Sequence, residues 1–156
     1  MVGGFPAWTS AGSNTTRVTV NFPVVSSTSL VNVTGLTATL TGGLNYTFMA
    51  RLYYTDAAAG GVQASICGTT TATNIVYNGR VIDSGSNGIK GATQATALCT
   101  VVANTPTTGT SGLTEINGTI TVNTAGTLTV QFAQNTSNGT ASIVLQGSTF
   151  SVNNIQ

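Results

Sequence analysis

Apolar and polar residues alternate with a period of two along most of this chain. In NYTFMARLYYT, residues 45–55, one face carries Tyr46, Phe48, Ala50, Leu52 and Tyr54. The same alternation recurs in segments 116–122 and 128–132, and at positions 143, 145, 150 and 152. Successive side chains of a strand point to opposite faces, so each set predicts the buried face of a strand. No window has a convincing helical period.

Clusters of Gly and Asn, such as NTAG and NTSNG, separate these runs as turns. We therefore predict an all-β, antiparallel β-sandwich of about nine strands. Residues 27–156 form this single domain, and residues 1–26 form an extended N-terminal arm. The stretch 68–94 is looser, with a strand near 75–82 and then a loop. It and segment 103–112 are the candidates for crossings between sheets or for exposed loops.

The chain is almost free of charge. Charged residues make up 4% of its 156 residues and the net charge is +1, whereas about a quarter of an ordinary soluble domain is charged. Thr, Ser, Asn, Gln and Gly must therefore form the wet surface, and a net charge near zero favours association. The basic residues are scattered in the sequence at Arg17, Arg51, Arg80 and Lys90. They form no continuous basic stripe, so we expect neither nucleic acid nor an anionic membrane as a partner.

Catalytic groups are scarce. The chain has no His, and its acids are Asp56, Asp83 and Glu115, so no Ser-His or Cys-His pair exists. We expect no enzyme, no cofactor and no metal. The segment DSGSNG, from Asp83, resembles the start of a calcium loop, but Gly85 and Gln94 stand where ligands are expected. It is read as a turn.

Two cysteines, Cys67 and Cys99, lie in separate strand-like runs. The favoured reading is two small buried thiols in a reducing cytoplasm. A disulfide remains possible if the two runs are neighbours.

The N-terminal segment MVGGFPAWTS lacks the basic start and the apolar run of a secretory signal, and no stretch has the ~20 apolar residues of a membrane span. Within residues 1–26, isolated aromatic residues are spaced through polar, Gly-rich sequence. The simplest interpretation of residues 1–26 is a frayed terminus or an edge strand with no docking role. The alternative is a docking arm whose aromatics Phe5, Trp8 and Phe22 insert into another protein, because a lone Trp is costly to leave in water.

Three blocks carry a resemblance to a known family. The segment INGTITVNTAGTLTVQFAQNTSNGTASIVLQGSTFSVNNI, residues 116–155, resembles the C-terminal module of structural proteins from tailed bacteriophages. Residues 29–55 are similar to the opening of that module, and TATNIVYNG followed by ATQATAL is similar to its middle. The resemblance implies a jelly-roll (TNF/C1q-like) sandwich that often forms trimers on fibre, tail and head surfaces, and it implies no catalytic residue.

The resulting expectation is a virion structural protein, either a capsid decoration or a head-fibre protein. It would be assembled in the host bacterial cytoplasm, dock on other virion proteins through its arm, and project a homotrimeric sandwich from the virion surface. The alternative is a tail-fibre tip or receptor-binding module that recognises a host surface glycan or protein, with Tyr53 and Tyr54 available for sugar contacts. A secreted adhesin or pilus-like subunit is a third interpretation.

Overall fold

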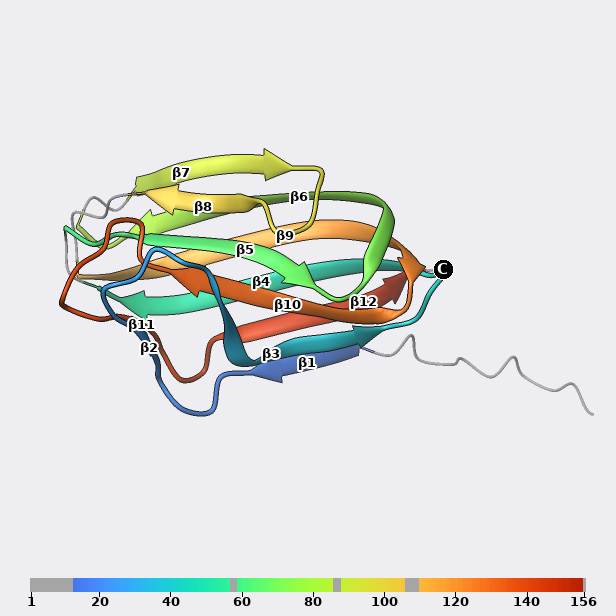
Figure 1. The fold of residues 1–156 in the computed structure, drawn as a ribbon, viewed down its shortest axis with the longest axis horizontal. Helices are drawn as coiled ribbons and strands as arrows, with labels where there is room; N and C mark the ends of the chain where they lie inside the picture. Colours follow the sequence, from blue (N-terminus) through green and yellow to red (C-terminus); the bar gives the residue numbers. More distant parts are fainter. Residues whose placement is uncertain (1–12, 57–58, 86–87, 106–109, 156) are drawn as a thin grey trace, which may run out of the picture.

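The computed structural model describes residues 13–56, 59–85, 88–105 and 110–155 (Figure 1). Twelve strands and no helix occur in these ranges. The strands are β1 (Ser13–Arg17), β2 (Phe22–Val24), β3 (Val31–Leu40), β4 (Asn45–Thr55), β5 (Val62–Gly68), β6 (Thr71–Asp83), β7 (Gly88–Ala95), β8 (Val101–Thr105), β9 (Ser111–Thr124), β10 (Gly126–Ala133), β11 (Ser142–Val144) and β12 (Thr149–Ile155). The all-β prediction is confirmed.

The strands form two antiparallel sheets that enclose one core. The larger sheet has eight strands, with β1-β12-β4-β9-β6-β7 as its main path and β11 and β2 added beside β4. The smaller sheet has four strands in the order β3-β10-β5-β8. In Figure 1 the two sheets lie one behind the other with their strands running lengthwise.

The eight strands from β3 to β10 pair in a nested order, with the connection from β6 to β7 at the centre. β6 pairs with β7, β5 with β8, β4 with β9 and β3 with β10. Each pair therefore encloses the previous one along the chain, and successive pairs alternate between the two sheets. Strands β1, β12, β11 and β2 widen the larger sheet beyond β4.

Period-two alternation does mark the buried faces. All five predicted side chains of β4 are buried, as are the core positions Leu128, Val130 and Phe132 of β10. Full burial of such a side chain contributes roughly 1.5–3 kcal/mol. Where aromatics crowd the core, β9 supplies glycine: Gly118 lies between Phe48 and Tyr77 in the register. Large side chains thus face small ones across the sheet.

Three expectations need correction. Residues 88–95 form β7 rather than a loop, because backbone pairing with β6 holds a segment whose side chains are mostly exposed and leave no alternation. In β11 the buried residues are Ser142 and Val144, so the predicted face of Ile143 and Leu145 is shifted by one residue. These short or edge strands also raise the number from about nine to twelve.

The expected arm of residues 1–26 is partly built into the sandwich. Within it, β1 pairs along its whole length with β12, and β2 pairs with β11. β1 is polar and adds to a sheet edge, so no buried stripe marks it in the sequence. Residues 1–12 lie outside the described part of the chain.

Candidate functional site

Two of the three predicted docking residues, Phe5 and Trp8, lie outside the described residues. The third, Phe22, lies in β2 opposite Val144 of β11 and packs, partly buried, against the core. It therefore belongs to the sandwich and not to a projecting arm.

The topology gathers three of the four basic residues on the outer face of the larger sheet. In the register, Arg17 of β1 lies opposite Thr149 of β12, and Thr149 lies opposite Arg51 of β4. Arg51 faces Glu115 of β9, which in turn faces Arg80 of β6. We call Arg17, Arg51, Glu115 and Arg80 the arginine row. Neighbouring strands lie about 4.8 Å apart, so consecutive arginines are about 10 Å apart along it. These three basic residues are thus not scattered in space, whereas Lys90 lies outside the row.

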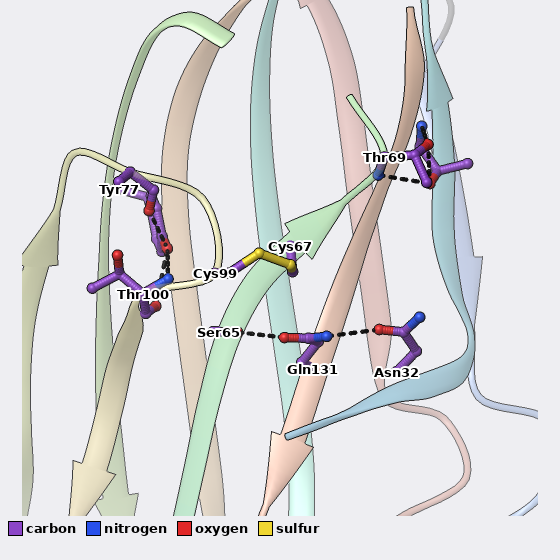
Figure 2. Close-up of a disulfide and its surroundings, with 10 residues drawn as sticks. Asn32, Ser65, Cys67, Thr69, Tyr77, Cys99, Thr100 and Gln131 are labelled. Carbon is purple, nitrogen blue, oxygen red and sulfur yellow. Dashed lines mark hydrogen bonds between the residues drawn. A yellow bond between two sulfur atoms is a disulfide. The ribbon is translucent and has the colours of Figure 1, made fainter. Parts of the chain in front are cut away.

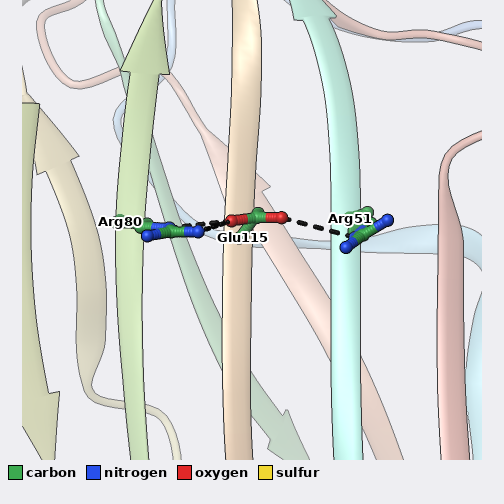
Figure 3. Close-up of polar contacts among 3 residues, drawn as sticks. All are labelled: Arg51, Arg80 and Glu115. Carbon is green, nitrogen blue, oxygen red and sulfur yellow. Dashed lines mark hydrogen bonds and ion pairs between the residues drawn. The ribbon is translucent and has the colours of Figure 1, made fainter. Parts of the chain in front are cut away.

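Glu115 is the centre of the row (Figure 3). Its Oε2 accepts a hydrogen bond from Nε of Arg80 at 2.7 Å and also pairs with Nη2 of that residue. Its Oε1 lies 3.3 Å from Nε of Arg51. The Glu115 side chain is 9% exposed, whereas those of Arg51 and Arg80 are 48% and 47% exposed. One nearly buried carboxylate therefore pairs with two guanidinium groups that are still partly exposed to water.

The stabilising effect of this cluster is small, since partly exposed ion pairs contribute at most about 1 kcal/mol. Its electrostatic effect is larger. Three arginines and one glutamate leave the row with two positive charges in excess. The two other acids of the chain, Asp56 and Asp83, are buried and are not on this row.

Amide side chains lie beside the row. Two residues along the strands from Arg80 and Glu115, Asn78 of β6 lies opposite Asn117 of β9 on one side and Gln94 of β7 on the other. Together with Arg80, these amides line a hollow of about 460 Å³. A second hollow continues along β9 past Asn78, Asn117 and Thr119, and a third follows at Thr119 and Thr121. A shallow groove lined by both polar and apolar side chains, the latter including Val76 and Ile155, therefore follows the outer face of β9.

Apolar side chains lie on the opposite side of the row. Tyr53 of β4, Leu113 of β9 and Ile82 of β6 face one another in the register and line a further hollow. The Tyr53 side chain is exposed, but Tyr54 is fully buried. Of the two tyrosines considered for sugar contacts, only Tyr53 is available.

The outer face of the smaller sheet is neutral. Across it, Ser65 donates a hydrogen bond to Gln131 Oε1 at 3.1 Å, and Gln131 Nε2 donates to Asn32 Oδ1 at 2.9 Å (Figure 2). The hydroxyls of Thr37 and Thr129 form a parallel link at 3.1 Å. Neutral polar side chains thus bond to one another across three strands and take the place of surface charges.

A disulfide joins Cys67 of β5 to Cys99 in the turn before β8 (Figure 2), so the favoured reading of two thiols is wrong. Cys99 is exposed, and its amide donates to the carbonyl of Ile66, the neighbour of Cys67, at 2.8 Å. This turn contact between distant segments brings the sulfurs together, and the sequence gives no local sign of it.

In the segment from Asp83, Ser84 and Gly85 form a turn at the end of β6, and residues 86 and 87 lie outside the described part of the chain. The Asp83 carboxylate accepts a hydrogen bond from the amide of Gly85 at 3.2 Å. Among the described residues there is no group of three His, Cys, Asp or Glu side chains that could hold a metal. Nor does the described part of the chain contain a helix suited to crossing a bilayer.

Comparison with known proteins finds no family model that matches this sequence and no curated protein that is significantly similar to it.

Proposed function

We propose that this chain is a structural protein of a bacteriophage virion surface, a capsid decoration or head-fibre protein with a jelly-roll sandwich. The observation that carries the proposal is the nested pairing of β3–β10, β4–β9, β5–β8 and β6–β7 in two sheets. Eight strands in two Greek keys describe a jelly roll, an architecture frequent in viral capsid and lectin domains. The inference from this strand pairing to a virion role rests on analogy between folds.

The neutral face of the smaller sheet supports a role in a particle that meets varied media. The links Ser65–Gln131–Asn32 and Thr37–Thr129 contain no titratable group. Salt screening and pH therefore have little effect on them. Such a face suits either water or a neighbouring copy, in keeping with a homotrimer.

In this proposal the docking segment is residues 1–12, with Phe5 and Trp8 as its anchors on other virion proteins. Deletion of residues 1–12 removes none of the twelve strands. The shortened protein is therefore expected to fold but to be absent from particles. Full occupancy by the shortened protein would overturn the docking role.

A second candidate function is host recognition at a tail-fibre tip. The arginine row, with the amide-lined groove on one side and Tyr53 on the other, is the observation that favours it. Neutral hydrogen-bonding groups beside an exposed aromatic ring suit a sugar chain.

Immunogold electron microscopy of intact particles tests the two functions. Gold over the heads supports decoration or a head fibre, and gold at the tail end supports host recognition. Particles purified free of unbound protein and carrying no gold would contradict both. Sedimentation equilibrium of the purified chain checks the trimer independently.

A further inference from the structure

The outward side of the arginine row is unneutralised. Within the described residues, Glu115 pairs with Nε of Arg51 and with Nε and Nη2 of Arg80. Beyond these contacts the side chains of Arg51 and Arg80 stay 48% and 47% exposed, so part of each guanidinium group faces water. We propose that Arg51 and Arg80 bind a carboxylate of an acidic glycan, a sugar chain of the uronic-acid type, that lies along the groove of β9. The inference deepens the second candidate function and rests on it for its biological setting.

Glu115 acts as a positioning residue in this site. Its side chain is nearly buried between the two arginines, and it holds the inner edge of each guanidinium group. A guanidinium held in this way loses less conformational freedom when an anion binds. Because two cations share one anion, the pair keeps a positive charge for the ligand.

A second copy of the chain does not provide the missing carboxylate. The sequence contains three acidic residues. Glu115 is already part of the row, and Asp56 and Asp83 are only 6% and 0% exposed. The acidic side chains of a neighbouring copy are thus poorly exposed for contact with the arginines, and the excess positive charge favours a different molecule as the partner.

The neighbours of the arginines favour a sugar chain over an acidic protein or a nucleic acid. On one side the hollow is lined by the amides of Asn78, Gln94 and Asn117, which offer both donors and acceptors for hydroxyl groups. On the other side, two residues along β4 from Arg51, the exposed Tyr53 offers a ring face. Two residues of a strand span about 7 Å. The groove therefore places an aromatic surface, a carboxylate site and an amide hollow in sequence. A nucleic acid would need cations along its whole path.

The test is calorimetric titration of the full chain with a linear oligomer of galacturonic acid. The matched ligand is the same oligomer with its carboxylates methyl-esterified. We expect the acid form to bind at least tenfold more tightly than the ester. Arg51→Gln, which leaves the Arg80–Glu115 pair in place, should weaken binding of the acid form at least tenfold and leave the ester unaffected. Lys90→Gln removes the one basic residue outside the row and should change neither.

Circular dichroism and thermal melting verify that each variant is folded. Asn117→Ala should weaken both ligands, since it removes hydroxyl contacts rather than charge. Equal binding of acid and ester, equal effects of Arg51→Gln and Lys90→Gln, or no binding by folded wild-type protein would each overturn the site. If the wild-type protein bound no glycan and Arg51→Gln had a lower oligomeric mass than wild type, the arginine row would be assigned to a subunit interface. Immunogold labelling reports the particle location separately, so failure of the ligand and failure of the host-recognition role are distinguishable.

Discussion

Phe48 and Tyr77 pack ring against ring across Gly118, with their centroids 6.0 Å apart and their planes at 58°. A Cβ atom on Gly118 would lie 2.6 Å from Cζ of Phe48 and closer still to Cβ of Tyr77. Gly118→Ala should therefore force the rings apart and lower the free energy of unfolding by roughly 1–3 kcal/mol. Urea denaturation measures the loss. Gly139→Ala is the control, because nothing lies within 4 Å of a Cβ there. Equal midpoints for the two variants would contradict this packing.

Tyr54 should make the fold sensitive to alkali. Burial, followed by the carboxylates of Asp56 and Asp83, raises the pKa of the Tyr54 phenol far above its ordinary value of 10.0. Below that value the phenol is protonated in both states, and its contribution to stability is complete. Above it the unfolded chain releases the proton first, so the free energy of unfolding falls by about 1.4 kcal/mol per pH unit.

Tyr54→Phe tests this dependence, because it removes one of the two buried tyrosines with raised pKa values. Burial is also the main cause of the raised pKa of Tyr77. The slope of unfolding free energy against pH above 10 should be shallower in Tyr54→Phe than in wild type. At neutral pH the Phe variant should stay within about 1 kcal/mol of wild type, since the Tyr54 hydroxyl has no hydrogen-bond partner among the described residues. An unchanged alkaline slope would show that the phenol titrates normally.

The Cys67–Cys99 disulfide should stabilise the domain measurably. It closes a loop with a sequence separation of 32, and constraint of the unfolded chain by a loop of this length is worth about 3–4 kcal/mol. Dithiothreitol should lower the melting temperature of wild type, and the double variant Cys67→Ser, Cys99→Ser should melt at that lower temperature with or without reductant. Identical wild-type curves in both conditions would mean that the bond is absent. If the chain is a virion protein assembled in a bacterial cytoplasm, as proposed, its thiols are kept reduced there and the bond should form after release from the cell. Under that proposal, thiol alkylation of fresh lysate against aged particles measures when the bond forms.

Gln134 is a buried amide whose four hydrogen-bonding positions are all used. Its Oε1 accepts from the amides of Ser27 and Asn138, and its Nε2 donates to the carbonyls of Asn138 and Thr140 at 3.0 and 2.8 Å. Gln134→Glu places a carboxylate oxygen against those two carbonyls. We expect a loss of about 2–3 kcal/mol at neutral pH that is partly recovered in acid, where the protonated group donates again. The exposed Gln146→Glu is the control. A pH-independent loss would point to packing rather than to hydrogen bonding.

The alternation of residue types predicts the faces of long strands because burial itself sets the pattern. The alternate residues from Tyr46 to Tyr54 and from Leu128 to Phe132 are buried as expected. The same signal fails for β7, whose residues mostly face solvent, Ile89 among them, and for β11, which has three residues. Backbone hydrogen bonds hold such strands, and these bonds do not select side chains.

The arginine row and the disulfide depend on contacts between segments distant in sequence. Arg17 and Arg51 meet on one face because β12, from the far end of the chain, pairs between their strands. Arg80 joins them through the register of β9. Likewise Cys99 reaches Cys67 through a turn whose contact partner, Ile66, lies on another strand. Register of this kind is set by the whole fold, so no local pattern predicts it.

The nested pairing also determines how the chain can reach its folded state. The β6–β7 pair closes the shortest loop, and each enclosing pair closes a longer one, up to β3 with β10. Pairing can therefore proceed outward from β6 and β7, with the loop-closure entropy rising at each step. Folding dominated by such non-local pairs is slow, on the order of milliseconds to seconds. On the ribosome, β3 and β4 must wait with open edges until β9 and β10 have been synthesised. The sparing use of charge on these strands therefore carries a risk of aggregation during synthesis, and rapid capture by a partner copy or a chaperone would limit it.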